Sequence, residues 1–326
     1  MRFRLSAVPF EGWFTLALLA LVLAIGQVAG LPFSLPSGSR AAFVGLHYLY
    51  PLIGLALWAV VVARSGRQRP VATFLVALPC YALVLLAHFN LKLWVPHLNP
   101  ALYDAQYWAI DQALRPLVEG CMALRRGLAW ALPLDSNFYL LGFIALFYLS
   151  FTVHAFGPKG DFRALVIAAI LFQGLGGLAY LIAPALGPFV YERGVEAMPD
   201  HAQQAMLATY REHVAGGSAW VALNGGKALT AGLAAMPSLH AGGSFLFLLF
   251  ALRHDRRLVW VMLPLWTFIS VDAIANRWHY LVDIPAGMML AWLSVRSGEA
   301  IAGAPALPLR ARWWPRPHRS PAFAPH

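Results

Sequence analysis

Two short stretches of the sequence carry residues suited to proton transfer and nucleophilic attack. The first, AMPSLHAG, places Ser238 and His240 at the start of an apolar run, and the second, NRWHYLVDIPAG, places His279 and Asp283 four residues apart. A spacing of four residues brings two side chains to one face of a helix, where a carboxylate can orient an imidazole and leave its other ring nitrogen free. These residue types predict phosphoryl transfer, in which one histidine attacks phosphorus and the other protonates the leaving oxygen.

The residues around His240 and Asp283 add to this prediction. Ser238 is a good helix N-cap, and Pro237 before it favours an extended entry into the helix. In the first turn of that helix, His240 would lie beside unpaired backbone N–H groups, which form a ready anion site. Asp283 falls in an apolar helix, where a carboxylate costs about 2.5–3.5 kcal/mol, so we expect His279 to be its partner.

The composition indicates that membrane helices position these side chains. Of the 326 residues, 60% are hydrophobic and only 12% are charged, whereas a soluble domain has about 25% charged residues. A bilayer core requires about 20 mostly apolar residues per helix. We therefore predict an all-α integral membrane protein, a polytopic bundle of about eight transmembrane helices. The expected spans are 13–33, 41–63, 71–94, 138–157, 163–183, 237–252, 258–275 and 279–296.

The chain divides into three predicted regions. Residues 1–70 form an N-terminal two-helix membrane region, 71–300 form the catalytic bundle, and 301–326 form a basic, Pro-rich cytoplasmic tail. Two long segments of the bundle, 95–137 and 184–236, lie between spans on the side opposite the termini. Such long segments in a compact domain are more often functional than not.

The net charge of +10 is distributed over alternate loops. Because basic loops stay on the cytoplasmic side, this pattern predicts that both termini are cytoplasmic and that the site faces the external (periplasmic or lumenal) side of an inner or plasma membrane. Basic residues interleaved with Trp313 and Trp314 in the tail suit an anionic lipid surface rather than nucleic acid. The two cysteines, Cys80 and Cys121, indicate neither a disulfide framework nor a metal cluster.

Helical periodicity is visible in both long segments. In 95–137, apolar residues from Tyr103 to Leu117 recur on one face, with Asp104 and Asp111 off that face, which predicts an amphipathic helix in the membrane interface. The alternative is a structural brace. In 184–236, Pro199 and Asp200 can start a short helix, which the Gly216–Gly217 pair would end.

At these residues the sequence resembles the type-2 phosphatidic acid phosphatase superfamily, and within it the branch of inositol phosphorylceramide synthases and sphingomyelin synthases. The matching stretches are AMPSLHAG, HYLVD and YLIAPALGP, which with their spans cover about 165–296. The resemblance implies that the C-terminal helices form a phosphatidic-acid-phosphatase-like catalytic core. It makes His279 the covalent nucleophile, Asp283 its orienter and His240 the general acid and base.

The resemblance also bears on the substrate. It implies that Ser238 lies near the phosphate, that no metal or cofactor is used, and that the substrates are phosphate esters of membrane lipids. Tyr280 is a further residue that we expect to contact substrate. The phosphatase branch has the motif KxxxxxxRP and an arginine six residues before the nucleophile, a position that Ala273 occupies here. The phosphate-binding cations therefore need other candidates, and the external ones are Arg277, Lys227 and Arg193.

The synthase branch lacks the same basic residues, which favours a head-group transferase like inositol phosphorylceramide synthase, with an alcohol such as inositol as acceptor. The alternative enzyme is a lipid phosphate phosphatase acting on phosphatidic acid or polyprenyl phosphate. The same residues could be buried polar groups that join helices, zinc ligands, or the proton relay of a transporter. Their placement at helix ends disfavours the relay. Other histidines, such as His88 in the third span, are expected to be packing residues.

Overall fold

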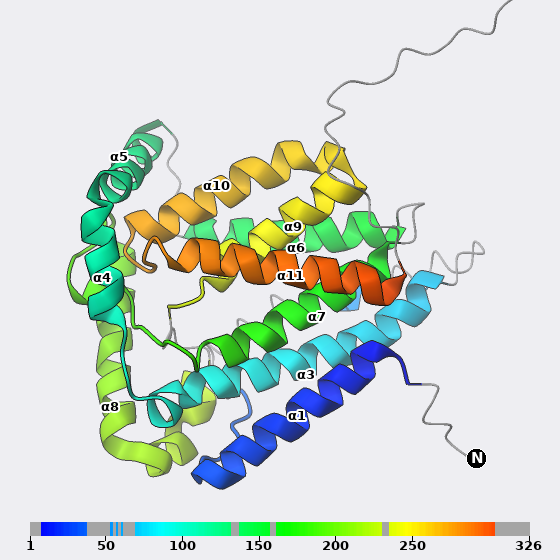
Figure 1. The fold of residues 1–326 in the computed structure, drawn as a ribbon, viewed down its shortest axis with the longest axis horizontal. Coiled ribbons are helices and arrows are strands. Elements are labelled where there is room, and N and C mark those ends of the chain that lie inside the picture. Colours follow the sequence, from blue (N-terminus) through cyan, green and yellow to red (C-terminus); the bar gives the residue numbers. More distant parts are fainter. Residues whose placement is uncertain are drawn as a thin grey trace, which may run out of the picture.

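The structure is a computed structural model that describes residues 8–37, 53–54, 57, 60, 69–131, 137–156, 161–229 and 235–303. Helices dominate this part of the chain, and most of them run side by side in one bundle (Figure 1). The helices of the bundle are α1 (Phe10–Ala29), α3 (Arg69–Leu98), α6 (Asn137–Phe156), α7 (Phe162–Ala179), α9 (Leu239–His254), α10 (Val259–Ala275) and α11 (Asp283–Ala302).

Helix α7 lies at the centre of the bundle. Within its apolar stretch 72% of the residues are buried, against 22% for α1 at the edge. Helices α3, α9 and α11 pack against α7, and α10 packs against α9. Because Arg163, which pairs with Glu11, is the one charged residue of α7, the helix can be enclosed by neighbours without burying an unpaired charge.

The structure confirms a helical membrane protein but not the expected number of eight spans. Five helices in the described residues are long and apolar enough to cross a bilayer: α1, the Val76–Leu98 part of α3, α6, α7 and the 256–275 segment that contains α10. Helix α9 has 16 residues, or about 24 Å at 1.5 Å per residue, and is shorter than a bilayer core of about 30 Å. Arg296 and Glu299 lower the hydropathy of α11. The span expected at 41–63 lies almost entirely outside the described residues.

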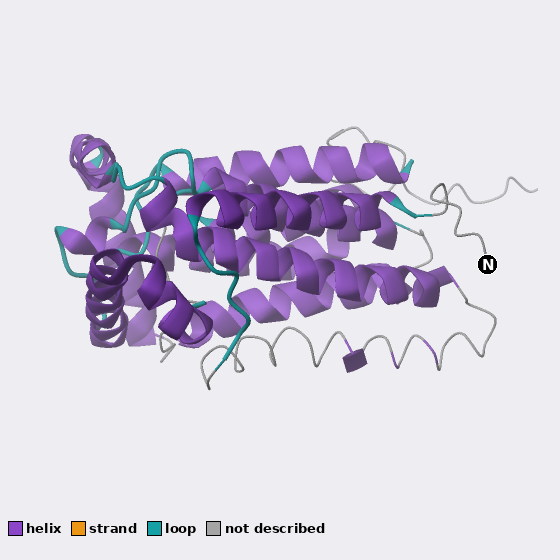
Figure 2. Ribbon diagram, turned by 90° about the horizontal axis from the view of Figure 1, so that it is seen from below, coloured by secondary structure: helices purple, strands orange, loops and turns teal. Residues whose placement is uncertain are grey.

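Three further helices lie across one end of the bundle, which we call the capped end (Figures 1 and 2). They are α4 (Asp104–Ala113), α5 (Arg115–Ala131) and α8 (Ala197–Ala228). The expected short helix after Pro199 is the first part of α8. Helical geometry is interrupted at Gly217 (φ 59°, ψ −149°) as the Gly216–Gly217 pair suggests, but it resumes beyond it.

The segment 95–137 differs from the expected single amphipathic helix, because it breaks at Leu114 into α4 and α5. The apolar residues Ile110 and Leu117 are 39% and 58% exposed, whereas Asp104 and Asp111 are buried against the protein. The carboxylates face inward because backbone N–H groups and basic side chains of the site loops pair with them. The outward apolar face of α4 and α5 is compatible with the membrane interface. The inward carboxylates of α4 form a structural brace, because they hold the site loops in place.

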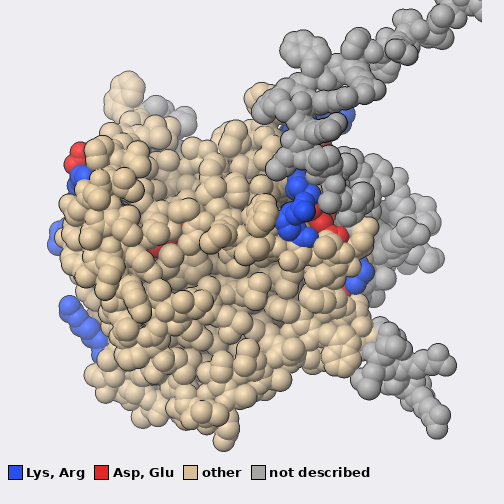
Figure 3. All heavy atoms as spheres, viewed as in Figure 1, with Lys and Arg blue, Asp and Glu red and all other residues tan. Residues whose placement is uncertain are grey.

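The surface seen in Figure 3 has charged side chains at its two ends and a broad uncharged area over the bundle helices. At the end opposite the capped end, buried ion pairs join the helices. Arg253 donates to both carboxylate oxygens of Glu299 at 2.5 and 2.7 Å, and His254 contacts Glu299 and Asp161. A bundle with charged ends and an apolar middle matches the profile of a bilayer.

The close contact of α9 with α11 leads to a prediction about stability. A Cβ atom at Gly287 would lie 2.2 Å from the carbonyl oxygen of Ser238, so Gly287→Ala has to push the two helices apart. We expect this variant to lose about 1–3 kcal/mol of unfolding free energy, as overpacked cores do, and to show a lower Tm in detergent. Gly120→Ala in α5 is the matched control, since no atom lies within 4 Å of a Cβ there. Equal Tm values for the two variants would contradict the prediction.

Candidate active site

His279 and Asp283 are in direct contact. His279 Nδ1 donates to Asp283 Oδ2 at 3.1 Å, and the same oxygen accepts the backbone N–H of Tyr280 at 2.9 Å. The expectation that one helix carries both residues is wrong, because α11 begins at Asp283 and His279 lies in the preceding turn. The turn forms because the carboxylate in the first helical turn reaches back to a free N–H group, as acidic residues at helix N-termini do.

This contact determines which nitrogen of His279 is free. The carboxylate accepts a hydrogen bond, so Nδ1 carries the proton and Nε2 keeps its lone pair. Asp283 is fully buried, while His279 is 8% exposed and lines a cavity. The free nitrogen belongs to the one member of the pair that a molecule in the cavity can reach.

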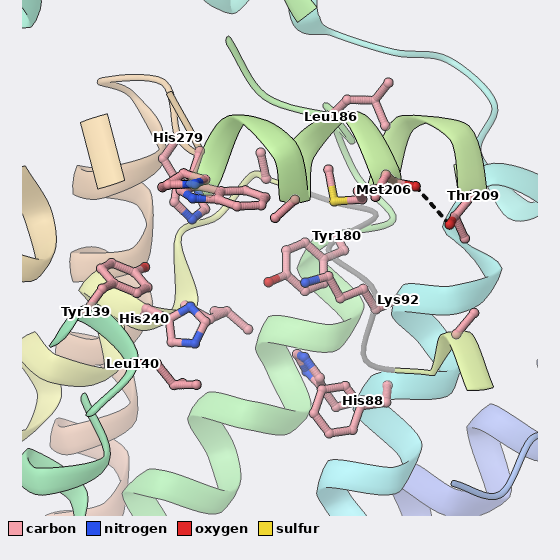
Figure 4. A pocket seen from close by; sticks show the side chains of 18 of the residues that line it. His88, Lys92, Tyr139, Leu140, Tyr180, Leu186, Met206, Thr209, His240 and His279 are labelled. Carbon is pink, nitrogen blue, oxygen red and sulfur yellow. Dashed lines mark hydrogen bonds between the residues drawn. The ribbon is translucent and has the colours of Figure 1, made fainter. Parts of the chain in front are cut away.

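His240 lies in the first turn of α9 and lines the same cavity as His279. Its ring makes edge contacts with Tyr139 and Phe143 of α6, at centroid distances of 5.3 and 4.9 Å. These two aromatic rings restrict the orientation of the imidazole. Figure 4 shows His279 and His240 on the same side of the cavity, one above the other.

Ser238 is the N-cap residue of α9, as predicted, but its side chain makes no capping hydrogen bond. Its Oγ is buried and has no hydrogen-bond partner in the described part of the chain. The backbone N–H of Ser238 instead donates to the carbonyl oxygen of Asp283 at 3.1 Å. This bond ties the start of α9 to the start of α11 and so holds the two histidine-bearing segments together.

The cavity has a volume of about 780 Å³, which lies in the range of small-molecule sites. Helices α3 and α6 contribute apolar residues such as Leu85, Phe89 and Leu140, although α3 also contributes basic residues. Helix α8 contributes apolar residues together with the polar residues Thr209, Glu212 and Asn224. The cavity lining is therefore mixed, with both apolar and polar side chains around the space that the two histidines face.

The carboxylates of α4 hold the loops that carry the site. Asp104 accepts the N–H groups of Leu186 and Gly187 at 2.9–3.1 Å and the hydroxyl of Tyr280 at 2.8 Å. Burial, together with the negative charge of Asp104, raises the pKa of Tyr280, so its hydroxyl stays protonated and donates. Tyr280 is fully buried and does not line the cavity, so the structure places it behind the site rather than among the substrate contacts.

Arg277 is also placed behind the site. It is fully buried, and its guanidinium lies 3.0 Å from Asp111, 3.2 Å from Glu192 and 5.4 Å from the ring centre of Trp108. The hydrogen bonds from Arg115 and the charge of Arg277 outweigh the effect of burial and hold the pKa of Glu192 below its usual range. A guanidinium that already has two carboxylate partners is a structural clamp. The structure does not bring Arg277 to the cavity.

The two other candidate cations are at the surface. Arg193 is 79% exposed, pairs with Asp200 at 3.7 Å and lies outside the cavity lining. Lys227, near the end of α8, is exposed but does line the cavity, at its outer edge. Of the three candidates, Lys227 is the one that the structure brings to the cavity.

The sequence reasoning missed several cavity residues, and three of them carry polar groups on one side of the cavity. Lys92, Tyr180 and His88 all line the cavity, and Figure 4 shows them on the side opposite the two catalytic candidates. A signal for Lys92 was present, because a lysine inside an apolar span marks a functional site by default. Tyr180 opens the stretch YLIAPALGP, and His88 was expected to be a packing residue. His88 Nδ1 does make a packing contact of that kind, with the carbonyl oxygen of Gln173 at 2.9 Å.

The arrangement suits attack on an electrophile held between two imidazoles. His279 offers an oriented lone pair, and His240 can exchange a proton across the same space. Among the described residues, no group of three or more His, Cys, Asp or Glu side chains has a geometry that could hold a metal ion.

Comparison with known proteins identifies one relationship. A protein-family model described as the PAP2 superfamily matches residues 107–297, which run from α4 through most of α11. No curated protein and no solved structure matches the chain. The matched region includes both histidine stretches. It also includes Asp111, one of the two α4 carboxylates that brace the site loops.

Proposed function

The chain belongs to the PAP2 superfamily, and on this basis we propose that it is a membrane enzyme that cleaves or transfers phosphate groups of lipids, with His279 as the nucleophile. The observation that carries the proposal is the contact between His279 and Asp283, on a cavity that His240 also lines. The apolar side chains that α3 and α6 contribute to the cavity suit the chains of a lipid, and the polar side chains of the lining suit its head group.

The first step forms a covalent intermediate. Nε2 of His279 attacks phosphorus, the bond from phosphorus to the lipid oxygen breaks, and that oxygen takes a proton from His240. Asp283 stabilises the positive charge that develops on the imidazole of His279, because its carboxylate stays ionised and accepts a hydrogen bond from Nδ1–H throughout. The product is a phosphohistidine and a free lipid alcohol.

The second step reverses the proton transfer. His240, now neutral, removes a proton from an incoming hydroxyl, whose oxygen attacks phosphorus. The bond from phosphorus to nitrogen breaks, and His279 regains its lone pair. Water as the incoming group gives hydrolysis, and an alcohol gives head-group transfer.

We favour an alcohol acceptor, as in inositol phosphorylceramide synthases. Thr209, Glu212 and Asn224 of α8 line the cavity and add hydroxyl, carboxylate and amide groups beyond those that a phosphate needs. A polyol such as inositol can form hydrogen bonds with all three kinds of group. A lipid phosphate phosphatase is the second candidate, and the exposure of the lining residues Glu212 and Lys227 favours it, because water can enter the cavity beside them.

The test measures transfer and hydrolysis together. The full chain in mild detergent is given phosphatidic acid, polyprenyl phosphate and phosphatidylinositol, each with and without ceramide, diacylglycerol and myo-inositol. We expect a phosphorylated alcohol to form faster than free phosphate. Phosphate release that is indifferent to the alcohol would replace the transferase with a phosphatase. The absence of both products, with proton-coupled solute uptake in vesicles, would replace the enzyme with a transporter.

A further inference from the structure

His88 uses one ring nitrogen for packing and leaves the other free. It lies on α3 within the apolar Val76–Leu98 stretch and lines the cavity. Its Nδ1 is 2.9 Å from the carbonyl oxygen of Gln173 on α7. A carbonyl oxygen can only accept, so Nδ1 carries the proton and Nε2 of the neutral ring keeps a lone pair. The second nitrogen is therefore a hydrogen-bond acceptor.

This acceptor meets no donor of the protein. Within the described residues, Nδ1 of His88 makes a hydrogen bond and Nε2 makes none. Nor is Nε2 one of the polar atoms that the protein encloses without a partner, so it borders the cavity. A lipid that fills the cavity and excludes water leaves Nε2 unsatisfied, at a cost in free energy, unless the lipid itself supplies a donor.

The ring of His88 is held in one orientation by its neighbours. Phe89 and Tyr180 contact it edge-on, at centroid distances of 5.4 and 5.6 Å. A Cβ atom at Gly177 would lie 3.1 Å from Nδ1, so the glycine provides the room for the ring to approach α7. Because the ring cannot turn without losing its bond to Gln173, the free lone pair is directed before any ligand arrives.

Two other roles for His88 explain less of this geometry. As a packing residue, which is the role expected from the sequence, it needs the bond from Nδ1 but not the second nitrogen. As an imidazolium it would bind an anion, but Lys92 lies four residues further along α3, and like charges at that spacing repel each other. The neutral ring with an accessible lone pair agrees with all of these contacts.

The place of His88 indicates which part of a substrate it meets. Leu85 and Phe89, its neighbours on α3, are apolar residues of the lining. In Figure 4, His88 lies on the side of the cavity away from His279. It is nevertheless close enough to His240 for their charges to interact. A group that meets Nε2 therefore belongs to the lipid, at the start of its apolar part and near the phosphate ester.

We propose that Nε2 of His88 accepts a hydrogen bond from a hydroxyl or amide N–H group of the lipid, beside its phosphate ester, and so selects lipids that carry such a donor. The esters of a diacylglycerol phosphate supply acceptors only, and a polyprenyl chain supplies neither donor nor acceptor. Both would leave the lone pair of His88 unsatisfied. This inference rests on the proposed function for the phosphate ester, and it adds which lipids the cavity prefers.

The test compares two lipids that differ in one hydroxyl. They are lysophosphatidic acid with an octanoyl chain and the analogue in which propanediol replaces glycerol. Each displaces radiolabelled octanoyl lysophosphatidic acid from the full chain in detergent, with His279→Ala present so that no turnover interferes. We expect the hydroxyl to strengthen binding by about tenfold, the effect of one net hydrogen bond. Equal affinity for the two lipids would overturn the proposal.

Variants of His88 in the same background assign the hydroxyl to this residue. His88→Phe keeps a ring but removes the acceptor, so the advantage of the hydroxyl should disappear. His88→Gln places an amide oxygen near the position of Nε2 and should retain most of the advantage. Phe89→Leu is the matched control, because it reshapes the lining without a polar group and should change the affinity for both lipids by the same factor. An advantage in His88→Phe as large as before the substitution would also overturn the proposal.

Failure of this inference can be told apart from failure of the proposed function. The binding measurement requires no turnover, whereas the enzyme is tested by the reaction of lipid phosphates with the unchanged protein. If no lipid phosphate is turned over but the advantage of the hydroxyl depends on His88, the enzyme is refuted and the donor site stands. If turnover depends on His279 but the hydroxyl gives no advantage, the enzyme stands and the role of His88 is refuted.

Discussion

Replacing His279 by alanine should abolish turnover of lipid phosphates and leave the protein folded. The hydrogen bond to Asp283 occupies Nδ1 of His279, so Nε2 keeps a lone pair that can react with a molecule in the cavity. Phosphate-ester hydrolysis is among the slowest uncatalysed reactions, with enzymatic accelerations of up to about 10²¹-fold, so no background reaction can conceal the loss. The measurement is the rate of phosphate release and transfer in detergent, together with the Tm.

Two further observations sharpen this prediction. A substrate with a labelled phosphorus should transfer the label to the unchanged protein, and no label should remain on His279→Ala. His201→Ala is the matched control, because His201 is an exposed histidine of α8 outside the cavity lining. The covalent mechanism is wrong if His279→Ala keeps more than a few per cent of the activity, or if it still takes up the label.

Asp283→Asn should reduce the rate by about 10²–10³-fold, the loss seen when one group that stabilises a developing charge is removed. Oδ2 of Asp283 accepts both the N–H of Tyr280 and Nδ1–H of His279, so the amide oxygen can take its place and keep both hydrogen bonds. The NH₂ group then takes the place of the other carboxylate oxygen, which has no partner in the described residues. What is lost is the negative charge that stabilises the positive charge on the imidazole when His279 attacks phosphorus.

This loss should appear in kcat rather than in KM or Tm. The second carboxylate oxygen of Asp283 is buried and has no partner in the part of the chain that the structure describes, so removing the charge relieves an unfavourable burial. Asp255→Asn, at the opposite end of the bundle, controls for the loss of a carboxylate. Activity of Asp283→Asn within tenfold of the unchanged protein would mean that the charge of Asp283 does not assist the attack by His279.

The contact between His279 and Asp283 shows how far local spacing can be used. Four residues of separation predicted that the two side chains meet, and they do, at 3.1 Å. The predicted helix between them was wrong, because the carboxylate uses the N–H of Tyr280 and starts the helix at its own position. Both geometries bring the same side chains together, so the pairing could be predicted although the backbone could not.

The clamp of Arg277 shows where local spacing fails. Its partner Asp111 is 166 residues away, on a helix whose inward face carries the carboxylates. The periodicity of 95–137 indicated an amphipathic helix, but it did not reveal that the polar face would be buried. Charged side chains normally face water, and only the N–H groups and the guanidinium of the two site loops make their burial favourable.

Lys92 illustrates a third case, in which a usable signal was present. A single lysine in an apolar span is unusual enough to predict a function, but the sequence does not say whether its ammonium turns to the membrane surface or to the interior. Packing of α3 against α7 places Tyr180 beside it and settles that choice.

By itself, the sequence determined what depends on composition and on neighbours along the chain: a helical membrane protein, membership of the PAP2 superfamily, the start of α9 after Ser238, and the pairing of His279 with Asp283. Hydropathy is a property of the residues themselves, and residues a few positions apart are held close together by the chain. Both can therefore be predicted from the sequence alone. The tertiary structure alone decided which cations are free. That depends on contacts between segments far apart in the chain, and those contacts commit Arg277 to Asp111 and leave Lys92 facing the cavity.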